Sequence, residues 1–458
     1  MAGEELDQQL AELPEGWKVV RLGDMISLRG GLSYKGEFLS DSGNSLVTMG
    51  CVSASERFKK SGLKRYSGDF TERHRLRVGD MVIATRDVTQ NRELLGSPAL
   101  VPEGLPGEAV IAATNLYMVA NHSESPTEFL YWLMKTPAYR NQIVASAKGT
   151  TIVMLTKDSV ENFTFPLPPL AEQKAIAAVL GALDDKIELN RRMNATLEAM
   201  ARALFQSWFV DFDPVRAKLD GLKPTGLDAA TSALFPAGFQ TSDAGQIPTG
   251  WRKTTVGEEV DFFTGFAFQS EAFSSSSNSV RLARGDNVKE GFFHWDSKSR
   301  FWPSITPELE RYRLNHGDVL IGMDGSKVGK NWVRVRNCDL PCLLVQRVAR
   351  LRAKQSIGEH FIWLLVSDRR FRLHVDGVKT GTSIPHISGG QIKDYDFVRP
   401  ARGDDRLFHR FEELVSPLGE QMDFNIEQSR TLATLRDSLL PKLLSGELSV
   451  ADTLSKSL

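Results

Sequence analysis

Basic side chains concentrate in two stretches of this chain, and clustered Lys and Arg side chains are suited to binding phosphate groups. Residues 56–92 contain ten basic and five acidic residues, a net charge of +5, and residues 281–352 contain fourteen basic and eight acidic residues, a net charge of +6. The whole chain has a net charge of only -1. Basic excess in two separate stretches predicts two surfaces that face a polyanion. A solvated surface of mixed charges is the alternative, and it is equally consistent with the charge count.

A short loop rich in glycine and hydroxyl groups follows each basic stretch. It reads Lys148-Gly149-Thr150-Thr151 in the first half and Thr380-Gly381-Thr382-Ser383 in the second. Glycine lets the backbone approach another surface closely, and hydroxyl groups and lysines are phosphate partners. An ordinary turn capped by its own hydroxyl group is the alternative.

The motifs of nucleotide and nucleic-acid enzymes are missing. The segment 325–331 resembles a phosphate-binding loop, but it is one residue short and lacks the final Ser or Thr. Neither a dinucleotide-binding glycine motif, a base-methylation motif nor an HExxH zinc motif is present, and the eight histidines are scattered. Cys338 and Cys342 have no second Cys/His pair at zinc-finger spacing, so we expect buried thiols and no metal site. This pattern favours recognition and scaffolding over catalysis, and we predict no catalytic residues.

Composition indicates a globular protein with real hydrophobic cores. The chain has 458 residues, of which 41% are hydrophobic and 25% are charged. Its longest apolar runs are far shorter than a membrane span, its start is acidic, and three cysteines are too few for a disulfide framework. We therefore expect a cytoplasmic protein without membrane contact.

The elements that must position the basic stretches occur twice. Residues 13–17 (LPEGW) return as 247–251 (IPTGW), and Gly23 and Gly31 return at the same offset of 234 as Gly257 and Gly265. The offset later drifts between 231 and 238, as small insertions and deletions in a duplicated unit would cause. A period this long predicts two whole domains, each an α/β mixture with short strands.

Each half ends in a long amphipathic helix. Prolines 166, 168 and 169 precede a helix over about 171–209, whose apolar residues alternate at spacings of four and three, and a matching helix closes the chain. The two apolar stripes are natural partners. Asn190 and Asn425 occupy equivalent seam positions, where a buried amide penalises misregistered pairing. Residues 211–246, rich in Gly, Pro, Ala and Asp, are expected to form a partly extended connector.

These helix sequences resemble a known family. Residues 167–176, 183–187 and 204–212 resemble the central conserved region of type I restriction-modification DNA specificity subunits. Residues 435–448 resemble the distal conserved region, and the Pro-x-Gly-Trp segments at 14 and 248 resemble the starts of the two target-recognition domains. The resemblance covers almost the entire chain.

The resemblance implies an α+β fold in which two pseudo-repeated mixed α/β target-recognition domains are joined by two long antiparallel coiled-coil helices. The expected boundaries are a first recognition domain at 1–168, a central helix at 169–210, a linker at 211–246, a second recognition domain at 247–403, a C-terminal helix at 404–447 and a tail at 448–458.

The resemblance also implies a non-catalytic subunit that reads double-stranded DNA and carries two methyltransferase subunits, with two restriction/translocase subunits as optional partners. S-adenosylmethionine, ATP and magnesium would belong to those partners, and this chain would bind no cofactor. Because the two recognition domains differ in sequence, the target is expected to be bipartite and asymmetric. A helix of about 39 residues is about 58 Å long, or about 17 base pairs, and would hold the half-sites about one DNA turn apart. The alternatives are a duplicated scaffold that binds protein or glycan, and a self-contained nuclease or methylase.

We expect the DNA contacts to include basic and hydroxyl residues of both domains: Arg57, Lys59, Lys60, Arg86, Lys148 and Thr150 in the first, and Lys298, Arg300, Lys327, Lys330, Lys379 and Thr382 in the second. Any of them could instead be a solvated surface charge. Candidates for methyltransferase docking are Phe205, Trp208, Phe209, Leu439 and Leu443, with internal closure of the helix pair as the alternative.

Overall fold

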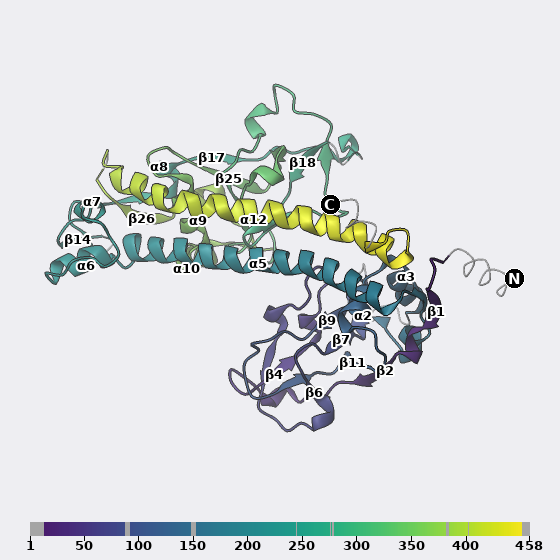
Figure 1. The fold of residues 1–458 in the computed structure, drawn as a ribbon. Coiled ribbons are helices and arrows are strands. Elements are labelled where there is room, and N and C mark those ends of the chain that lie inside the picture. Colours follow the sequence, from purple (N-terminus) through teal and green to yellow (C-terminus); the bar gives the residue numbers. More distant parts are fainter. Residues whose placement is uncertain are drawn as a thin grey trace. The chain divides into compact units, whose positions relative to one another are not determined.

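The computed structural model describes residues 13–87, 92–147, 153–243, 245–274, 276, 279–381, 384–401 and 403–450. The chain divides into two compact units, and each unit takes one part of both long helices. The first unit comprises residues 1–189 and 429–458, and the second comprises residues 190–428. The helices are α5 (Leu170–Phe209) and α12 (Arg406–Ser445), drawn in teal and yellow in Figure 1.

The first unit contains two main sheets. Four antiparallel strands run in the order β2-β11-β7-β9: β2 (Ile26–Gly30), β11 (Leu116–Asn121), β7 (Met81–Ala84) and β9 (Pro98–Leu100). Five strands run in the order β3-β5-β4-β10-β6: β3 (Leu39–Ser40), β5 (Lys64–Tyr66), β4 (Asn44–Val47), β10 (Val110–Ala112) and β6 (Arg75–Leu76). Two strand pairs and three helices complete it: β1 (Lys18–Arg21) with β13 (Thr164–Leu167), β8 (Arg86–Asp87) with β12 (Val153–Met154), α2 (Thr127–Leu133), α3 (Pro137–Ser146) and α4 (Lys157–Glu161).

The second unit repeats this topology. Its antiparallel sheet runs β17-β25-β22-β23: β17 (Val260–Thr264), β25 (Val348–Ala353), β22 (Val319–Gly322) and β23 (Trp332–Arg334). The parallel pair of β4 and β10 recurs as β18 (Val280–Ala283) with β24 (Cys342–Leu344), and β21 (Phe301–Trp302) extends that sheet. After residue 248, the second unit also contains β16 (Arg252–Thr255) with β26 (Asp396–Arg399), β19 (Val288–Lys289) with β20 (Phe292–Phe293), α8 (Val256–Glu259), α9 (Glu359–Ser367), α10 (Arg369–Val378) and α11 (Gly389–Lys393).

The glycines that recur in the two halves of the sequence are required by the same backbone geometry in each unit. A Cβ atom on Gly31 would collide with the carbonyl oxygen of Ala113, and one on Gly265 would collide with that of Val345, so two backbones come close at the same place in each unit. Gly79 and Gly317 have positive φ angles of 84° and 81°. The aspartate after each glycine accepts a hydrogen bond from a backbone N–H three residues before it, at 2.7 Å in the first unit and 2.8 Å in the second. The sequence repeat is therefore a repeat of structure.

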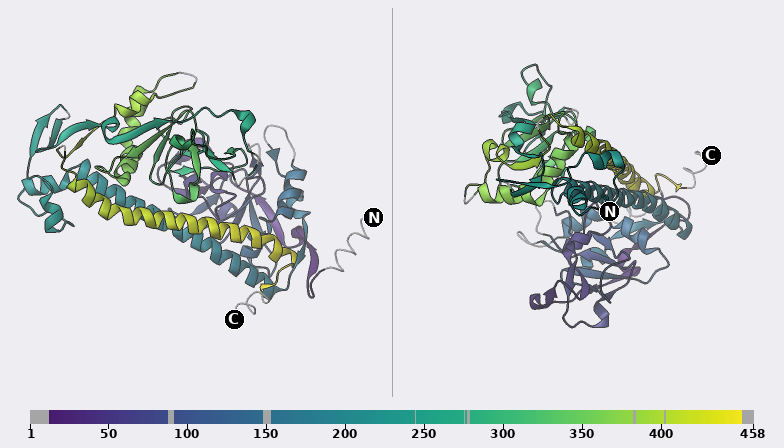
Figure 2. Two further views of the ribbon diagram at one scale, coloured as in Figure 1. Left: turned by 90° about the horizontal axis from the view of Figure 1, so that it is seen from above. Right: turned by 90° about the vertical axis from the view of Figure 1, so that its left-hand side faces the viewer.

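Within each unit the helix segments run antiparallel and lie side by side (Figures 1 and 2). In the first unit, Ile176 and Leu180 of α5 share one core with Leu440 and Leu443 of α12 and with the helix α2. In the second unit, the ring of Phe209 stacks on that of Phe408 with centroids 5.3 Å apart. The predicted class, two mixed α/β repeats with two long antiparallel helices, is confirmed.

The predicted seam amides meet. Asn190 and Asn425 are buried, Asn190 donates to the Asn425 carbonyl at 3.3 Å, and Asn425 donates to the side chain of Asn194 at 2.8 Å. Asn194 in turn donates to the carbonyl of Met422 at 3.1 Å. These bonds fix the register of the two helix segments in the second unit, because a slip would leave buried amides without partners.

The segment 211–246 is more regular than the partly extended connector we expected. It contains α6 (Asp213–Leu219), α7 (Ala229–Ala233) and β14 (Phe239–Ser242), which pairs with β15 (Gly245–Pro248). Pro214 opens α6, and the side chain of Asp228 caps α7 by accepting from the Thr231 N–H at 2.6 Å. Val215 and Phe235 are buried in the core of the second unit, so packing orders a sequence whose composition alone indicated a linker.

No helix among the described residues is long and apolar enough to cross a membrane.

Candidate nucleic-acid interface

Arg57 connects the sheets and short helices of the first unit to the helix α5. Its guanidinium Nη1 lies 2.9 Å from Asp185 Oδ1, its Nε lies 3.3 Å from Asp184 Oδ2, and its Nη2 donates to the Gly181 carbonyl at 3.4 Å. Asp184 is buried and is also paired with Arg436 of α12 at 2.6 Å. We expected Arg57 to contact DNA, but its guanidinium group contacts Asp184, Asp185 and the Gly181 carbonyl within the protein. The charge count missed this because the matching aspartates lie 127 and 128 residues away in sequence.

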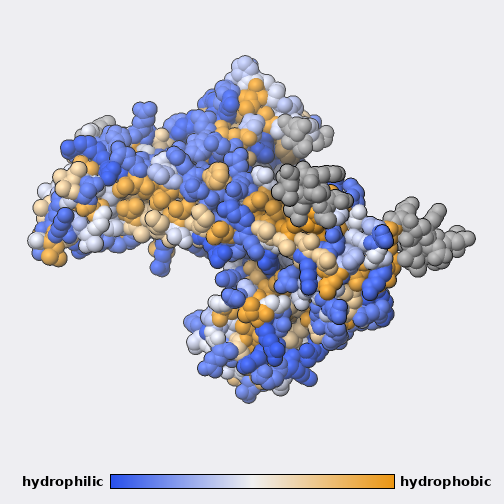
Figure 3. All heavy atoms as spheres, in the orientation of Figure 1, coloured by the Kyte–Doolittle hydropathy of each residue, from blue (hydrophilic) through white to orange (hydrophobic). Residues whose placement is uncertain are grey.

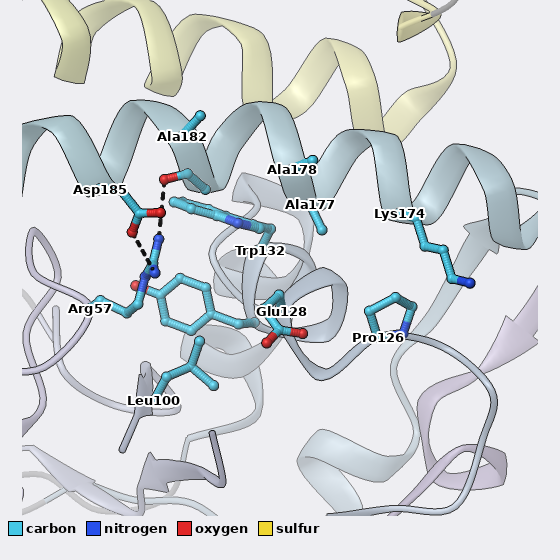
Figure 4. Close-up of a pocket in the computed structure, with 12 residues that line it drawn as sticks. Arg57, Leu100, Pro126, Glu128, Trp132, Lys174, Ala177, Ala178, Ala182 and Asp185 are labelled. Carbon is cyan, nitrogen blue, oxygen red and sulfur yellow. Dashed lines mark hydrogen bonds and ion pairs between the residues drawn. The ribbon is translucent and has the colours of Figure 1, made fainter. Parts of the chain in front are cut away.

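A groove lies beside this cluster, between α2 and α5 of the first unit (Figure 4). Its volume is about 470 Å³, and its α5 wall includes the small residues Ala177, Ala178 and Gly181 between Lys174 and Asp185. Burial raises the pKa of Tyr131, whose ring lies under the ammonium group of Lys135 at 4.9 Å. Burial also lowers the pKa of Lys135 to about 8, and its ammonium group donates to the Ala54 carbonyl at 3.1 Å. These contacts fix the side of the first unit's short helices that packs against α5.

The second unit uses a buried ionic cluster for the same purpose. Arg334, 2% exposed, pairs with Asp423 of α12 at 2.7 Å, and Arg336 pairs with the same carboxylate at 3.1 Å. His316 completes the cluster, with Nε2 3.0 Å from Asp423 and Nδ1 3.5 Å from Glu359. The hydrogen bond to Asp423 raises the pKa of His316. Burial alone would raise the pKa of Asp423, but the bond from His316 and the charges of the two arginines outweigh burial and lower it.

A second carboxylate of α12 holds the start of α9. Glu412 accepts from the backbone N–H groups of His360 and Phe361, both at 3.0 Å, and from His360 Nδ1 at 2.8 Å. A carboxylate at a helix N-terminus is stabilised by the unpaired N–H groups and the helix dipole. In each unit, charged side chains as well as apolar packing therefore anchor the sheets and short helices to a long helix.

The remaining basic candidates of the first unit lie near solvent where the structure describes them. Lys59 and Lys60 are exposed at the turn between β4 and β5. Arg86 is partly exposed on β8. Lys148 and Thr150 lie outside the described residues.

In the second unit, two predicted cations, Lys330 and Lys379, act on the same carboxylate. Lys327 and Lys330 are exposed in the turn between β22 and β23, and Lys379 is exposed after α10. Lys379 pairs with Asp376 at 2.5 Å, and the pKa of Asp376 is lowered first by this bond and further by the charges of Arg372 and Lys330. Lys330, Arg372 and Lys379 therefore lie around one carboxylate, that of Asp376.

The other candidates of the second unit lie elsewhere. Lys298 is exposed and Arg300 is half-buried, and both lie between β20 and β21. Thr382 lies outside the described residues.

One basic cluster was not singled out from the sequence. Arg29, Arg73, Arg75 and Arg77 line a cavity of about 260 Å³ in the first unit, together with Glu72 and Asp80. Their signal in the sequence is the close spacing of Arg73, Arg75 and Arg77, although Arg73 lies in a short 3-10 helix and only Arg75 lies in the strand β6. Arg311 and Arg313 recur at an offset of 238 in the second unit.

The predicted docking residues are mostly core residues. Phe205, Trp208 and Phe209 are 2–5% exposed in the core of the second unit, Leu443 is 2% exposed in the core of the first, and Leu439 is partly buried against that core. The burial of these residues favours the alternative, in which they pack inside the helix pair, because buried side chains offer no surface to a partner. In Figure 3, apolar residues do show on the visible face where α5 and α12 run. Exposed large apolar side chains on these helices are Leu189, Met193, Met200, Phe424 and Leu435.

Two of the three cysteines are buried as expected, but Cys338, for which we also expected a buried thiol, is partly exposed. Cys51 and Cys342 are buried, and burial raises the pKa of the Cys51 thiol to about 11. Across the described residues, His, Cys, Asp and Glu side chains do not gather into any group of three that could hold a metal ion.

Comparisons with known proteins agree on one kind of relative. Residues 14–199 match the family described as "Type I restriction modification DNA specificity domain". The chain is 26% identical over 330 residues to the type I restriction enzyme MjaIX specificity subunit of Methanocaldococcus jannaschii, covering 71% of this chain and 70% of the relative. It is 20% identical over 443 residues to the MjaVIII specificity subunit of the same organism, covering 96% and 94%. Its fold is similar to the crystal structure of a type I restriction-modification S subunit from M. genitalium, with a TM-score of 0.52, 16% identity and coverage of 93% and 96%.

Proposed function

We propose that this chain, which is similar to type I restriction-modification specificity subunits, reads a bipartite DNA sequence for a multisubunit methyltransferase. The observation that carries the proposal is the duplicated topology. The sheets and short helices of each unit form one fold, which we call the recognition fold, and it is built twice. Each copy has exposed cations and is anchored to a long helix. Two copies of one fold suit the two strands of a duplex. Since the copies differ in sequence, the two half-sites differ, and the target is asymmetric.

The chain acts without catalytic residues of its own. Two methyltransferase subunits supply the chemistry with S-adenosylmethionine, and restriction/translocase subunits, where present, use ATP and magnesium. The complex works in the cytoplasm, where its DNA substrate lies. The residues of this chain supply affinity through cations that meet phosphates and specificity through side chains that meet base edges.

Methylome sequencing of cells with and without this chain tests the proposal. We expect one bipartite methylated motif to disappear when the chain is deleted and to return with the wild-type chain. The same motif, placed in a duplex, should bind the purified complex with a salt dependence that reflects its phosphate contacts, a log-log slope of about -5 for six phosphates. An unchanged methylome together with salt-insensitive binding to protein or glycan would favour a scaffold instead. Methyl transfer or DNA cleavage by the purified chain alone would contradict a non-catalytic role.

A further inference from the structure

A small two-stranded element follows the four-stranded sheet in both units. In the first unit residues 86–87 pair with 153–154, and Leu155 donates its N–H to the Thr85 carbonyl at 2.9 Å. In the second unit Asp324 pairs with His386, and Ile387 donates to the Met323 carbonyl, also at 2.9 Å. Each element begins directly after the equivalent strand, β7 or β22. One backbone framework is therefore built twice at the same place.

The inward side of this element is the same in both units. Leu155 is 3% exposed and Ile387 is 1% exposed, and each belongs to the core of its own unit. Asp87 is buried in the first unit and accepts from the backbone N–H groups of Leu94 and Leu95 at 2.7 and 3.2 Å. Apolar anchoring and this buried carboxylate hold the backbone in place, so the outward side chains start from a fixed framework.

The outward side of the element differs between the units. Arg86 and Met154 stand opposite each other in the first unit, where Met154 is 46% exposed. Asp324 and His386 take their places in the second unit, and Ile384, two residues before His386, is 68% exposed. A guanidinium donates to both O6 and N7 of guanine, a carboxylate accepts from N4 of cytosine, and an apolar side chain packs on the thymine methyl group. The two units thus present different base-reading chemistries on one framework.

In the second unit, cations border the element. Gly325, whose N–H donates to the Pro385 carbonyl at 2.9 Å, begins the turn that carries Lys327 and Lys330. Lys379 directly precedes Thr380, which exchanges two backbone hydrogen bonds with His386 at 2.9 and 2.8 Å. Lysines therefore lie beside outward side chains that differ between the two units. This arrangement matches the division between phosphate contacts, which position a protein, and base contacts, which specify a sequence.

We propose that this element is the base-reading part of each recognition fold, an inference that rests on the proposed DNA function. Arg86 and Met154 contact base edges of one half-site, and Asp324, Ile384 and His386 contact base edges of the other. Asp324 is held for this purpose by Arg347, whose Nε lies 3.4 Å from its carboxylate.

The test measures base preference separately from affinity. The complex of the full chain with its methyltransferase subunits is titrated with the motif found by methylome sequencing, with every single base-pair change of that motif, and with an unrelated duplex. Arg86→Ala should reduce the preference for one base pair of a single half-site by about 5- to 150-fold, with the salt slope unchanged. Asp324→Ala should do the same in the other half-site. Matched controls are Arg21→Ala and Asp286→Ala, which remove exposed charges of the same type from the same units.

The outcomes separate the two proposals. If the wild-type complex does not prefer its motif over an unrelated duplex, the proposed function fails. If it does, but Arg86→Ala and Asp324→Ala keep every base preference within twofold, the inference is wrong and the function stands. If Arg86→Ala weakened binding of the motif and of the unrelated duplex equally and gave a smaller salt slope, Arg86 would be a phosphate contact, which also overturns the inference. Thermal unfolding of each variant identifies any loss caused by misfolding.

Discussion

At the scale of single residues, the charges with buried partners serve the fold, and the exposed cations remain the predicted DNA contacts. Arg334 is buried, and its partner Asp423 is only 16% exposed, so each charge would be expensive to leave alone in a medium of low dielectric constant. Asp184 has the same position in the first unit between Arg57 and Arg436. Removing one partner of such a cluster leaves an unpaired buried charge, and this asymmetry makes the clusters testable.

Asp423→Asn should destabilise the second unit by about 3–5 kcal/mol, because it leaves Arg334 and Arg336 without their shared carboxylate. Chemical unfolding followed by tryptophan fluorescence measures the loss. Glu413→Gln, on the same helix but with a largely exposed side chain, is the matched control and should change stability by less than about 1 kcal/mol. Equal stability of the two variants would contradict an anchoring role for the cluster.

The same cluster predicts a pH dependence. The folded-state pKa of His316 is raised, so its contribution to stability is present below its unfolded pKa of 6.5 and is lost as the pH rises through the folded value. The pKa of Asp423 is lowered, so its contribution is present above 3.8 and is lost as the pH falls through the folded value. The stability difference between wild type and His316→Gln should be largest between about pH 4 and 6.5 and should shrink as the pH rises through the folded-state pKa of His316. A difference that is constant across this range would show that His316 does not titrate with folding.

Residue roles were the hardest feature to predict from the sequence. Arg57 and Arg334 both fall within the basic stretches, and nothing local distinguishes them from Lys59 or Lys327. The distinction depends on aspartates of the long helices, which tertiary structure brings next to the arginines. Phe205 and Trp208 raised the same difficulty, because an aromatic side chain near a helix end fits a core and a docking surface equally well in the sequence.

At the scale of elements, periodicity was sufficient for the long helices but not for the connector. The apolar spacing predicted a helix over 171–209, and α5 spans Leu170–Phe209. The paired asparagines were recognised because they interrupt an otherwise apolar seam. The helices α6 and α7 were missed because they are short and their order depends on buried contacts of Val215 and Phe235.

The exposed apolar side chains of the long helices give a corrected docking prediction. Met200 is 50% exposed and Phe424 is 58% exposed, and both belong to the second unit. Met200→Asp and Phe424→Asp should each weaken methyltransferase binding at least tenfold, because a desolvated carboxylate is unfavourable in an interface. Co-purification and titration calorimetry measure the effect. Leu373→Asp, at an equally exposed apolar residue of α10, is the control, and weakening by all three variants alike would point to misfolding.

At the scale of the whole molecule, the duplication makes the two recognition functions separable. Each unit has its own sheets and its own cores, so one recognition fold can be exchanged without the other. Replacing residues 13–168 with the equivalent domain of a relative should change one half-site and leave the other. The donor must keep a basic residue that meets Asp184 and Asp185, because Arg57 makes that contact here. Methylome sequencing reads the result, and a change in both half-sites would contradict modular recognition.

The long helices predict how the gap between half-sites is set. Because α5 and α12 each contribute to both units, residues added at the boundary between units lengthen the helices and leave each core intact. Inserting seven residues after Leu189 and seven after Gln428 adds about 10.5 Å to each helix and nearly two full turns, so the helix faces keep their phase. The preferred gap should grow by about three base pairs, with both half-sites unchanged. Inserting seven residues after Leu189 in α5 alone is the control, since helices of unequal length cannot keep the helix pairing of both units and stability should fall instead. An unchanged gap in the double insertion would show that something other than helix length sets the spacing.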